Sequence, residues 1–168
     1  MENKKNLIET VILIAACIIC AIFIFTKPIM IAIVSGSSME PTLVDKDILL
    51  MNKIRNINDK DIVVAKQPEE WGDSSKLLIK RVVAKPGDEL EIIDGRIYVN
   101  DRLVMDVSEY YPRIKDLKVT LNNSYFIKGD NTNKSADSLF HYYMGDEKFL
   151  IDASAIEYSR NGGNYEWK

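Results

Sequence analysis

Two side chains of this sequence have the surroundings expected of a nucleophile and its base, and the first is Ser38. It follows Gly36 and precedes a Met-Glu-Pro-Thr segment. Glycine permits unusual backbone dihedral angles, and Pro41 restricts its own backbone and that of Glu40, so we expect the serine hydroxyl to be fixed and accessible. A serine hydroxyl is a weak nucleophile at its ordinary pKa and needs a neighbouring base.

Lys80 is the candidate base, because the alternation in Leu77–Val83 predicts a strand. Successive side chains of a strand face opposite ways, so Lys80 shares a face with Leu78 and Val82, whereas Arg81 points away. An ordinary lysine has a pKa of about 10.4, and desolvation among apolar neighbours lowers it by several units. An isolated Lys-Arg pair more often lies on an exposed strand face, so the neighbouring motifs decide between the two interpretations.

Three short motifs occur in order along the chain. They are Ser-Met-x-Pro-Thr-Leu from Ser38, Lys-Arg-Val from Lys80 with Pro-Gly-Asp from Pro86, and Gly-Asp-Asn from Gly129 with Ser-x-Asp-Ser from Ser135. This set resembles that of the bacterial type I signal peptidases, membrane-anchored Ser/Lys proteases, in a compact single-span form like that of Gram-positive bacteria. The resemblance implies a mostly β fold, with a signal-peptidase-like β-sheet catalytic domain behind one N-terminal transmembrane helix.

The resemblance also implies a mechanism. Neutral Lys80 takes the proton of Ser38, the alkoxide attacks the scissile carbonyl, and a water activated by Lys80 hydrolyses the acyl-enzyme. We expect the backbone N–H of Ser38 to bind the oxyanion. Some family members have a serine hydroxyl two positions before the nucleophile as a second donor. Gly36 occupies that position here and belongs to the predicted site, while Ser35 and Ser37 are possible substitutes.

Other polar residues of the predicted site come from the third motif. By position, Ser135 corresponds to the serine that orients the lysine ammonium. Asp130, Asp137 and Ser138 match the remaining polar positions and are predicted to support the site, as is Met39 beside the nucleophile.

Two positions depart from the family pattern. Leu139 stands where the family usually has an arginine, so Asp137 lacks its expected partner, and either another cation serves or the site is looser. A further motif, usually Gly-Asp before a Val/Ile run, appears as Lys60-Asp61 without its glycine. Both departures leave open an unusual substrate.

The length of 168 residues suits one domain with a small appendage, and a hydrophobic content of 46% is enough for a core. The net charge of −3 gives no basic footprint, so nucleic acid is not an expected partner. The sequence has no Cys/His cluster of metal-ligand spacing and no phosphate-binding glycine loop, so no metal or cofactor is implied.

The N-terminal region predicts a membrane anchor. Residues 1–9 form a polar tail, Thr10–Thr26 carries no charge, and a predicted span at 10–33 can cross a hydrocarbon core of about 30 Å. A cleaved signal peptide is disfavoured because no small-x-small site in a polar context follows. More lysines precede the span than follow it, which favours a cytoplasmic tail and an extracytoplasmic catalytic domain at 34–168.

Beyond the span, short runs rich in β-branched residues predict strands. Asp94-Gly95 is a two-residue hairpin signal, and Asn100-Asp101 turns the chain again, within a small hairpin insertion at about 91–122. A polar, exposed loop is expected between Lys66 and Lys76. The predicted strands are Asp47–Met51, Asp61–Ala65, Leu77–Val83, Glu89–Ile93, Arg96–Val99, Val119–Leu121 and Ser124–Lys128.

His141 raises a second catalytic hypothesis, a Ser38/His141/Asp137 triad. Its offset from Asp137 suits a helix, but Phe140–Tyr143 is more typical of a surface segment that packs its aromatic rings. We therefore expect a surface histidine without a catalytic role.

The sequence as a whole predicts a membrane-bound serine endopeptidase that removes signal peptides from secretory preproteins at the outer membrane face. One alternative is a catalytically weak or inactive homologue that acts as a binding or pilus-type assembly chaperone, and the presence of both Ser38 and Lys80 argues against it. Another is a self-cleaving Ser/Lys regulator, disfavoured by the span. The expected partners are signal-peptide-bearing preproteins and the lipid bilayer, and no oligomeric state is indicated.

Overall fold

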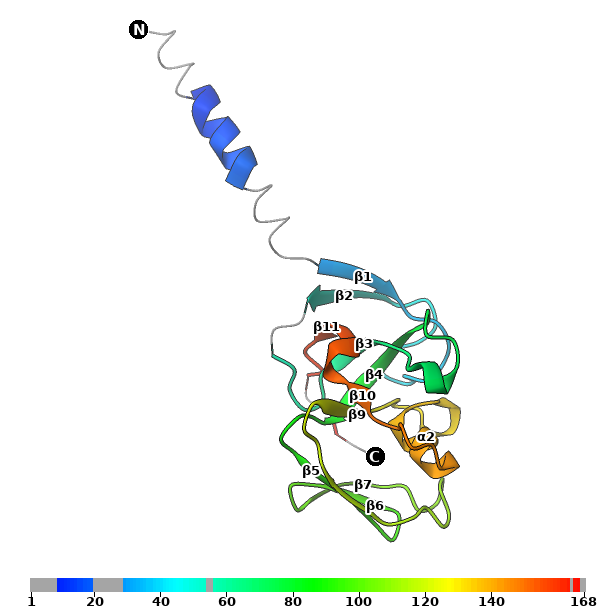
Figure 1. The fold of residues 1–168 in the computed structure, drawn as a ribbon. Coiled ribbons are helices and arrows are strands. Elements are labelled where there is room, and N and C mark those ends of the chain that lie inside the picture. Colours follow the sequence, from blue (N-terminus) through cyan, green and yellow to red (C-terminus); the bar gives the residue numbers. More distant parts are fainter. Residues whose placement is uncertain (1–8, 20–28, 54–55, 164, 167–168) are drawn as a thin grey trace, which may run out of the picture.

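The computed structural model describes residues 9–19, 29–53, 56–163 and 165–166. Within these residues, strands dominate and form two antiparallel sheets (Figure 1). The prediction of a mostly β fold is therefore confirmed.

The larger sheet has seven strands in the order β1-β2-β11-β3-β4-β9-β10. Strand β4, next to the central strand β3, pairs with β3 over Leu77–Arg81 and with β9 only from Arg81 onward. The strands are β1 (Ile29–Ile33), β2 (Ile48–Lys53), β3 (Ile62–Lys66), β4 (Leu77–Ala84), β9 (Ser124–Lys128), β10 (Ile151–Asp152) and β11 (Ile156–Arg160).

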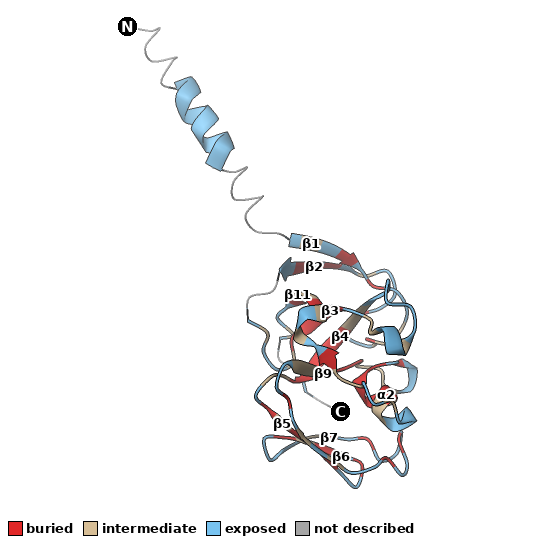
Figure 2. Ribbon diagram, in the orientation of Figure 1, coloured by how far each residue is buried: buried red, intermediate tan, exposed pale blue. Residues whose placement is uncertain are grey.

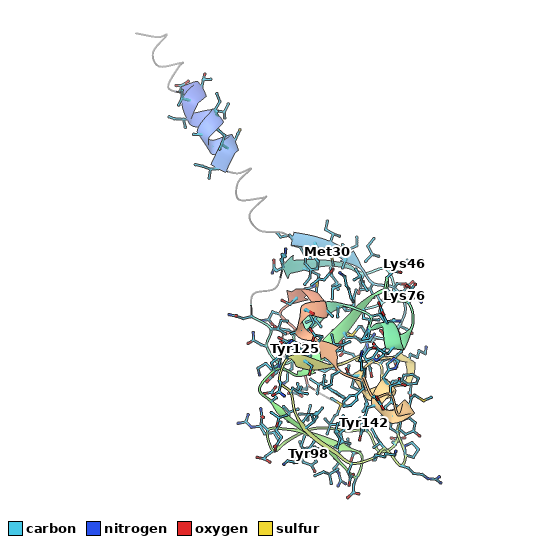
Figure 3. The ribbon with its side chains drawn as sticks, viewed as in Figure 1. Met30, Lys46, Lys76, Tyr98, Tyr125 and Tyr142 are labelled. Atoms are coloured by element: carbon cyan, nitrogen blue, oxygen red, sulfur yellow. The ribbon has the colours of Figure 1, made fainter. Side chains whose placement is uncertain are left out.

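The smaller sheet has the order β7-β6-β5-β8 and is inserted between β4 and β9. Asp94 and Gly95 both have positive φ, 50° and 74°, as a tight two-residue hairpin turn requires, and Asn100 and Asp101 repeat this at the next turn. Both predicted turns are confirmed. The strands are β5 (Glu89–Ile93), β6 (Arg96–Val99), β7 (Arg102–Asp106) and β8 (Leu117–Thr120). Figure 3 shows Tyr98, on β6, at the opposite end of the domain from Met30, on β1.

Helix α2 (Ser138–Met144) follows the third motif, and Asp137 caps it by accepting the N–H groups of Leu139 and Phe140. Phe140–Tyr143 is thus helical, with His141 buried, Phe140 and Tyr142 half-buried and Tyr143 exposed, and its aromatic rings pack as expected. The N-cap carboxylate stabilises the helix here, since it satisfies backbone donors that have no partner within the helix. The described residues also include three short 3-10 helices: η1 (Glu69–Trp71), η2 (Thr132–Lys134) and η3 (Ala153–Ala155).

Buried residues occur on both sheets and on α2 (Figure 2). Their apolar side chains form clusters that pack these elements together. Leu139 packs with Leu90 and Ile97 of the small sheet. Met39 belongs to the same buried cluster as Met51 of β2. The segment that carries the candidate nucleophile is therefore anchored in the core by Met39, which is 1% exposed.

The N-terminal region differs from the predicted anchor at one end. Ile29–Ile33, the last part of the predicted 10–33 span, forms β1 and pairs with β2. A short apolar run rich in isoleucine suits a strand as well as a membrane helix, so periodicity alone could not separate the two. Residues 9–19 are helical, and 20–28 lie outside the described residues. Within the described part of the chain, no helix has the length and apolar content needed to span a bilayer.

Candidate active site

The side chains of Ser38 and Lys80 meet. Lys80 Nζ lies 2.7 Å from Ser38 Oγ and 3.3 Å from the carbonyl oxygen of Ile79. Lys80 is only 4% exposed, whereas Ser38 is half-buried. A lysine amine this close to a serine hydroxyl is within reach of its proton.

Burial lowers the pKa of Lys80, because desolvation disfavours the ammonium form. The negative charges of Asp137 and Asp130 oppose this shift, and the positive charge of Lys128 adds to it. Lys80 stands opposite Val63 in the centre of the large sheet, which accounts for its desolvation.

The third motif holds the nucleophile segment in place. The Asn131 N–H donates to the carbonyl of Ser38 at 3.0 Å, and Asn131 Nδ2 donates to that of Ser37 at 3.1 Å. A Cβ on Gly129 would collide with Ser135 Oγ and with the Ser38 carbonyl, so only glycine fits there. Gly36 has a φ of 87°, which favours glycine, and its N–H donates to Asp45 Oδ1.

Ser135 and Ser138 have different surroundings. Ser135 Oγ is buried and has no hydrogen-bond partner among the described residues. An unpartnered buried hydroxyl calls for an explanation, and one lies in the site itself, since the hydroxyl could accept from a lysine ammonium. Ser138 Oγ instead accepts the N–H of Ile127 at 3.1 Å, which ties α2 to β9.

Asp130 is paired with Arg81, which the sequence placed on the face away from Lys80. Arg81 Nε and Nη2 donate to the two carboxylate oxygens of Asp130 at 2.8 and 2.7 Å, and both side chains are fully buried. Arg81 also donates to the carbonyl of Lys60, and its guanidinium lies 3.7 Å from the ring centroid of Tyr165. Neither Arg81 nor Tyr165 was predicted to have a role in the site.

Lys60, which stands where the family motif has a glycine, adopts a backbone conformation that glycine favours. Lys60 has a φ of 71°, in the left-handed region where glycine is favoured. The turn therefore keeps the backbone conformation that a glycine would adopt without strain, and the Lys60 carbonyl still accepts from Arg81.

Leu139 stands where the family usually has an arginine, and the carboxylate of Asp137 is hydrogen-bonded to backbone N–H groups instead. Asp137 accepts the N–H groups of Gly129, Leu139 and Phe140 at 2.8, 3.1 and 3.1 Å. Its negative charge acts on two buried lysines, Lys80 and Lys128. Lys128 is therefore another cation near Asp137. It was not predicted to belong to the site, because in the sequence it is only the last residue of a predicted strand.

His141 takes no part in a triad with Asp137. Its Nδ1 lies 2.6 Å from Asp146 Oδ2, and its ring stacks on Trp71 at a centroid distance of 4.0 Å. The histidine is 8% exposed, so the expectation of a surface histidine is wrong. Trp71, expected in an exposed loop, covers it.

A cavity of about 320 Å³ opens beside Ser38 and Lys80. Its walls are β1 on one side and Leu77–Lys80 of β4 on the other, and Ser35 and Met39 also line it. Among the described strands, β1 has a partner on one edge only, and Leu77–Lys80 pair with β3 but not with β9. The cavity thus lies between two strand segments that each have an unpaired edge.

Comparison with known proteins agrees with this geometry. The sequence matches the family described as "Signal peptidase, peptidase S26" over residues 5–156. It is 29% identical to signal peptidase I U of Bacillus subtilis, over 92% of this chain and 89% of that protein. It is 32% identical to a probable signal peptidase I-2 of Synechocystis, over 89% and 69%.

A third relative is longer. Signal peptidase I of Streptococcus pneumoniae is 38% identical over 60% of this chain, and the match spans about half (48%) of that protein. Because the family match covers most of the chain and includes all three motifs, the chain belongs to the signal peptidase family S26, whose members are serine peptidases.

Proposed function

We propose that this chain is a membrane-bound serine endopeptidase that removes signal peptides from secretory preproteins through a Ser38/Lys80 acyl-enzyme. The contact of 2.7 Å between Lys80 Nζ and Ser38 Oγ, with the lysine buried, is the observation that carries the proposal.

In the proposed mechanism, neutral Lys80 accepts the Ser38 proton as Oγ attacks the scissile carbonyl. The ammonium then gives this proton to the leaving amine, and Lys80 next activates the water that hydrolyses the ester. Ser135 Oγ is the proposed acceptor for the transient ammonium, because it is buried beside Gly129 without another partner in the described structure. The N–H of Ser38 is the proposed oxyanion donor, and Ser35, which lines the cavity, is favoured over Ser37 as the second.

The proposed substrate is an extended peptide. An extended segment that enters the cavity can pair with the unpaired edges of β1 and of Leu77–Lys80, as strands are added in other peptide-binding proteins. Its scissile carbonyl would then lie beside Ser38. We expect small residues at the first and third positions before the cut.

The proposed location is the extracytoplasmic face of the cell membrane, with residues 1–9 in the cytoplasm and an anchor that ends before β1. One face of β1 and β2 supports this proposal, because it exposes a continuous set of large apolar side chains close to the cavity. Exposed patches of this kind mark contacts with a membrane or a partner. The residues are Ile29, Ile31, Ile33, Ile48 and Leu50.

The test is cleavage of a model preprotein by the detergent-solubilised full chain, with Lys80→Ala and the exposed-lysine control Lys76→Ala. We expect the wild type and Lys76→Ala to cut after a small-x-small site, and Lys80→Ala to be inactive. Equal cleavage by Lys80→Ala would overturn the proposed base. If the wild type bound several preproteins but cut none, a binding role would replace the catalytic one.

A further inference from the structure

Lys128 is a second buried lysine near the catalytic pair. It ends β9 and stands opposite Arg81 in the large sheet, with 3% of its surface exposed. Its Nζ donates to the carbonyl of Gly129 at 2.8 Å and to Thr132 Oγ1 at 2.7 Å. Gly129 is the residue that packs against Ser38 and Ser135, so Lys128 is bonded to the wall of the site.

The buried charges around the site do not balance if both lysines are protonated. Arg81 and Asp130 satisfy each other through two parallel hydrogen bonds. Asp137 remains, and it acts on both Lys80 and Lys128. The charge of Asp130 also reaches both lysines, but Arg81 offsets it, so one carboxylate without an arginine partner serves two lysines. Protonation of either lysine therefore disfavours protonation of the other.

Two tyrosines also face this group. Tyr111 donates to the carbonyl of Thr132, and Tyr165 packs on Arg81. Burial raises the pKa of both phenols, that of Tyr165 to about 12, so neither adds a negative charge near neutral pH. Among the described residues, the charges that act on both lysines are thus those of Asp137 and Asp130, while Tyr111 lies near Asp137, and Arg81 and Tyr165 lie against Asp130.

The hydrogen bonds decide which lysine holds the proton. Lys128 Nζ has two short bonds to acceptors, the Gly129 carbonyl and Thr132 Oγ1. Lys80 Nζ has one short contact, to a hydroxyl that can itself donate, and a longer one of 3.3 Å to a carbonyl. Burial lowers the pKa of Lys128 as well as that of Lys80, so burial alone does not separate the two lysines. Hydrogen bonding to the charged form favours that form, so of the two lysines Lys128 holds the proton better.

We propose that Lys128 is a positioning residue whose buried positive charge keeps Lys80 neutral and able to accept the Ser38 proton. This inference rests on the Ser38/Lys80 function proposed above. The same charge makes the transient Lys80 ammonium a stronger acid, which favours delivery of its proton to the leaving amine. Lys128 touches neither substrate nor reacting atoms, and it acts only through the field at Lys80.

The experiment measures single-turnover acylation of a model preprotein between pH 6 and 10 by the full-length wild type, Lys128→Met and Lys128→Arg. In the pH–rate profile of Lys128→Met, we expect the acid limb to shift to higher pH by about one unit or more. The acylation rate of this variant should therefore be about tenfold lower than that of the wild type at neutral pH and equal to it near pH 10. The Arg variant keeps the charge, so its profile should stay within a few tenths of a unit of the wild type.

Two further variants keep the outcome clear. Lys128→Gln retains a donor for Gly129 and Thr132 without the charge, and it replaces the Met variant should that one fail to fold. A loss of rate that is equal at every pH, or an equal shift in the Gln and Arg variants, would overturn the inference. Lys80→Ala is measured beside them. If Lys80→Ala were active, the proposed base would be overturned as well. If Lys80→Ala were inactive but the pH profile of Lys128→Met or Lys128→Gln did not shift, only the role of Lys128 would be overturned.

Discussion

The two sheets of this protein place their charged side chains differently. In the four-stranded sheet, the core is apolar, and the ion pairs, such as Arg96 with Asp106 at 3.2 Å, lie at the surface. In the seven-stranded sheet, Lys80, Arg81 and Lys128 are buried together with carboxylates. Buried charges are costly and are kept when paired or hydrogen-bonded, so their concentration on one sheet supports the proposed position of the active site.

The largest expected effect tests this contrast with two arginines. Arg81→Met leaves the carboxylate of Asp130 buried without its cation, and we expect the free energy of unfolding to fall by about 3–5 kcal/mol. Arg96→Met breaks an exposed pair, and we expect a loss of about 1 kcal/mol or less. Denaturant unfolding of the detergent-solubilised variants measures both.

A double variant sharpens this comparison. Arg81→Met with Asp130→Leu removes both buried charges, so much of the stability lost in Arg81→Met should return. If Arg81→Met and Arg96→Met were equally mild, the idea that the large sheet depends on its buried charges would be wrong.

A smaller effect follows from the opposite pKa shifts of two lysines. Burial lowers the pKa of Lys80, so between its folded and unfolded pKa the unfolded chain binds more protons, and stability rises with pH. Lys80→Met should therefore be more stable than the wild type near pH 7, by about 1–2 kcal/mol, and this advantage should shrink toward pH 10.

Lys118 of the small sheet is the control. Its hydrogen bonds to Glu91 and Glu89 raise its pKa in the folded state. The contribution of Lys118 to folding stability is therefore fully present below the unfolded pKa of lysine, and it is lost only as the pH rises through the folded pKa. Lys118→Met should thus be slightly less stable than the wild type, with a difference that is flat from pH 6 to 10. Unfolding curves over that range check both slopes, and parallel curves for wild type and Lys80→Met would refute a lowered pKa.

The local features of the fold could be predicted from the sequence, because a few neighbouring residues determine them. Asp94-Gly95 specified its hairpin, and the runs in β3, β4 and β5 specified strands. β1 was assigned to the anchor because an isoleucine-rich run is compatible with both environments, and only its pairing with β2 separates them. β11 was missed, although it lies inside the large sheet between β2 and β3.

The site divides in the same way. Ser38 and Lys80 were predicted to lie together because their motifs carry them, and the structure brings their side chains into contact. Lys128 and the Arg81–Asp130 pair were missed because strand register and the cap of α2 decide where these side chains meet. Periodicity gives the face of a strand on which a lysine lies, but not the carboxylate it faces across the sheet.

The smallest expected effect concerns backbone strain beside each sheet. Lys60, before β3, has a φ of 71°, and Asp94, between β5 and β6, has a φ of 50°. The left-handed conformation costs a residue with a Cβ about 1–2 kcal/mol, although short polar residues such as aspartate adopt it more readily. Replacement by glycine removes this strain but costs about 0.5–1 kcal/mol, because glycine loses more conformational entropy on folding. We therefore expect Lys60→Gly to stabilise the protein by about 0.5–1 kcal/mol and Asp94→Gly to have almost no effect, as measured by thermal unfolding.

Because the Lys60 carbonyl, not its side chain, binds Arg81, preprotein cleavage by Lys60→Gly should equal that of the wild type. A destabilised Lys60→Gly would mean that the lysine side chain itself supports the turn.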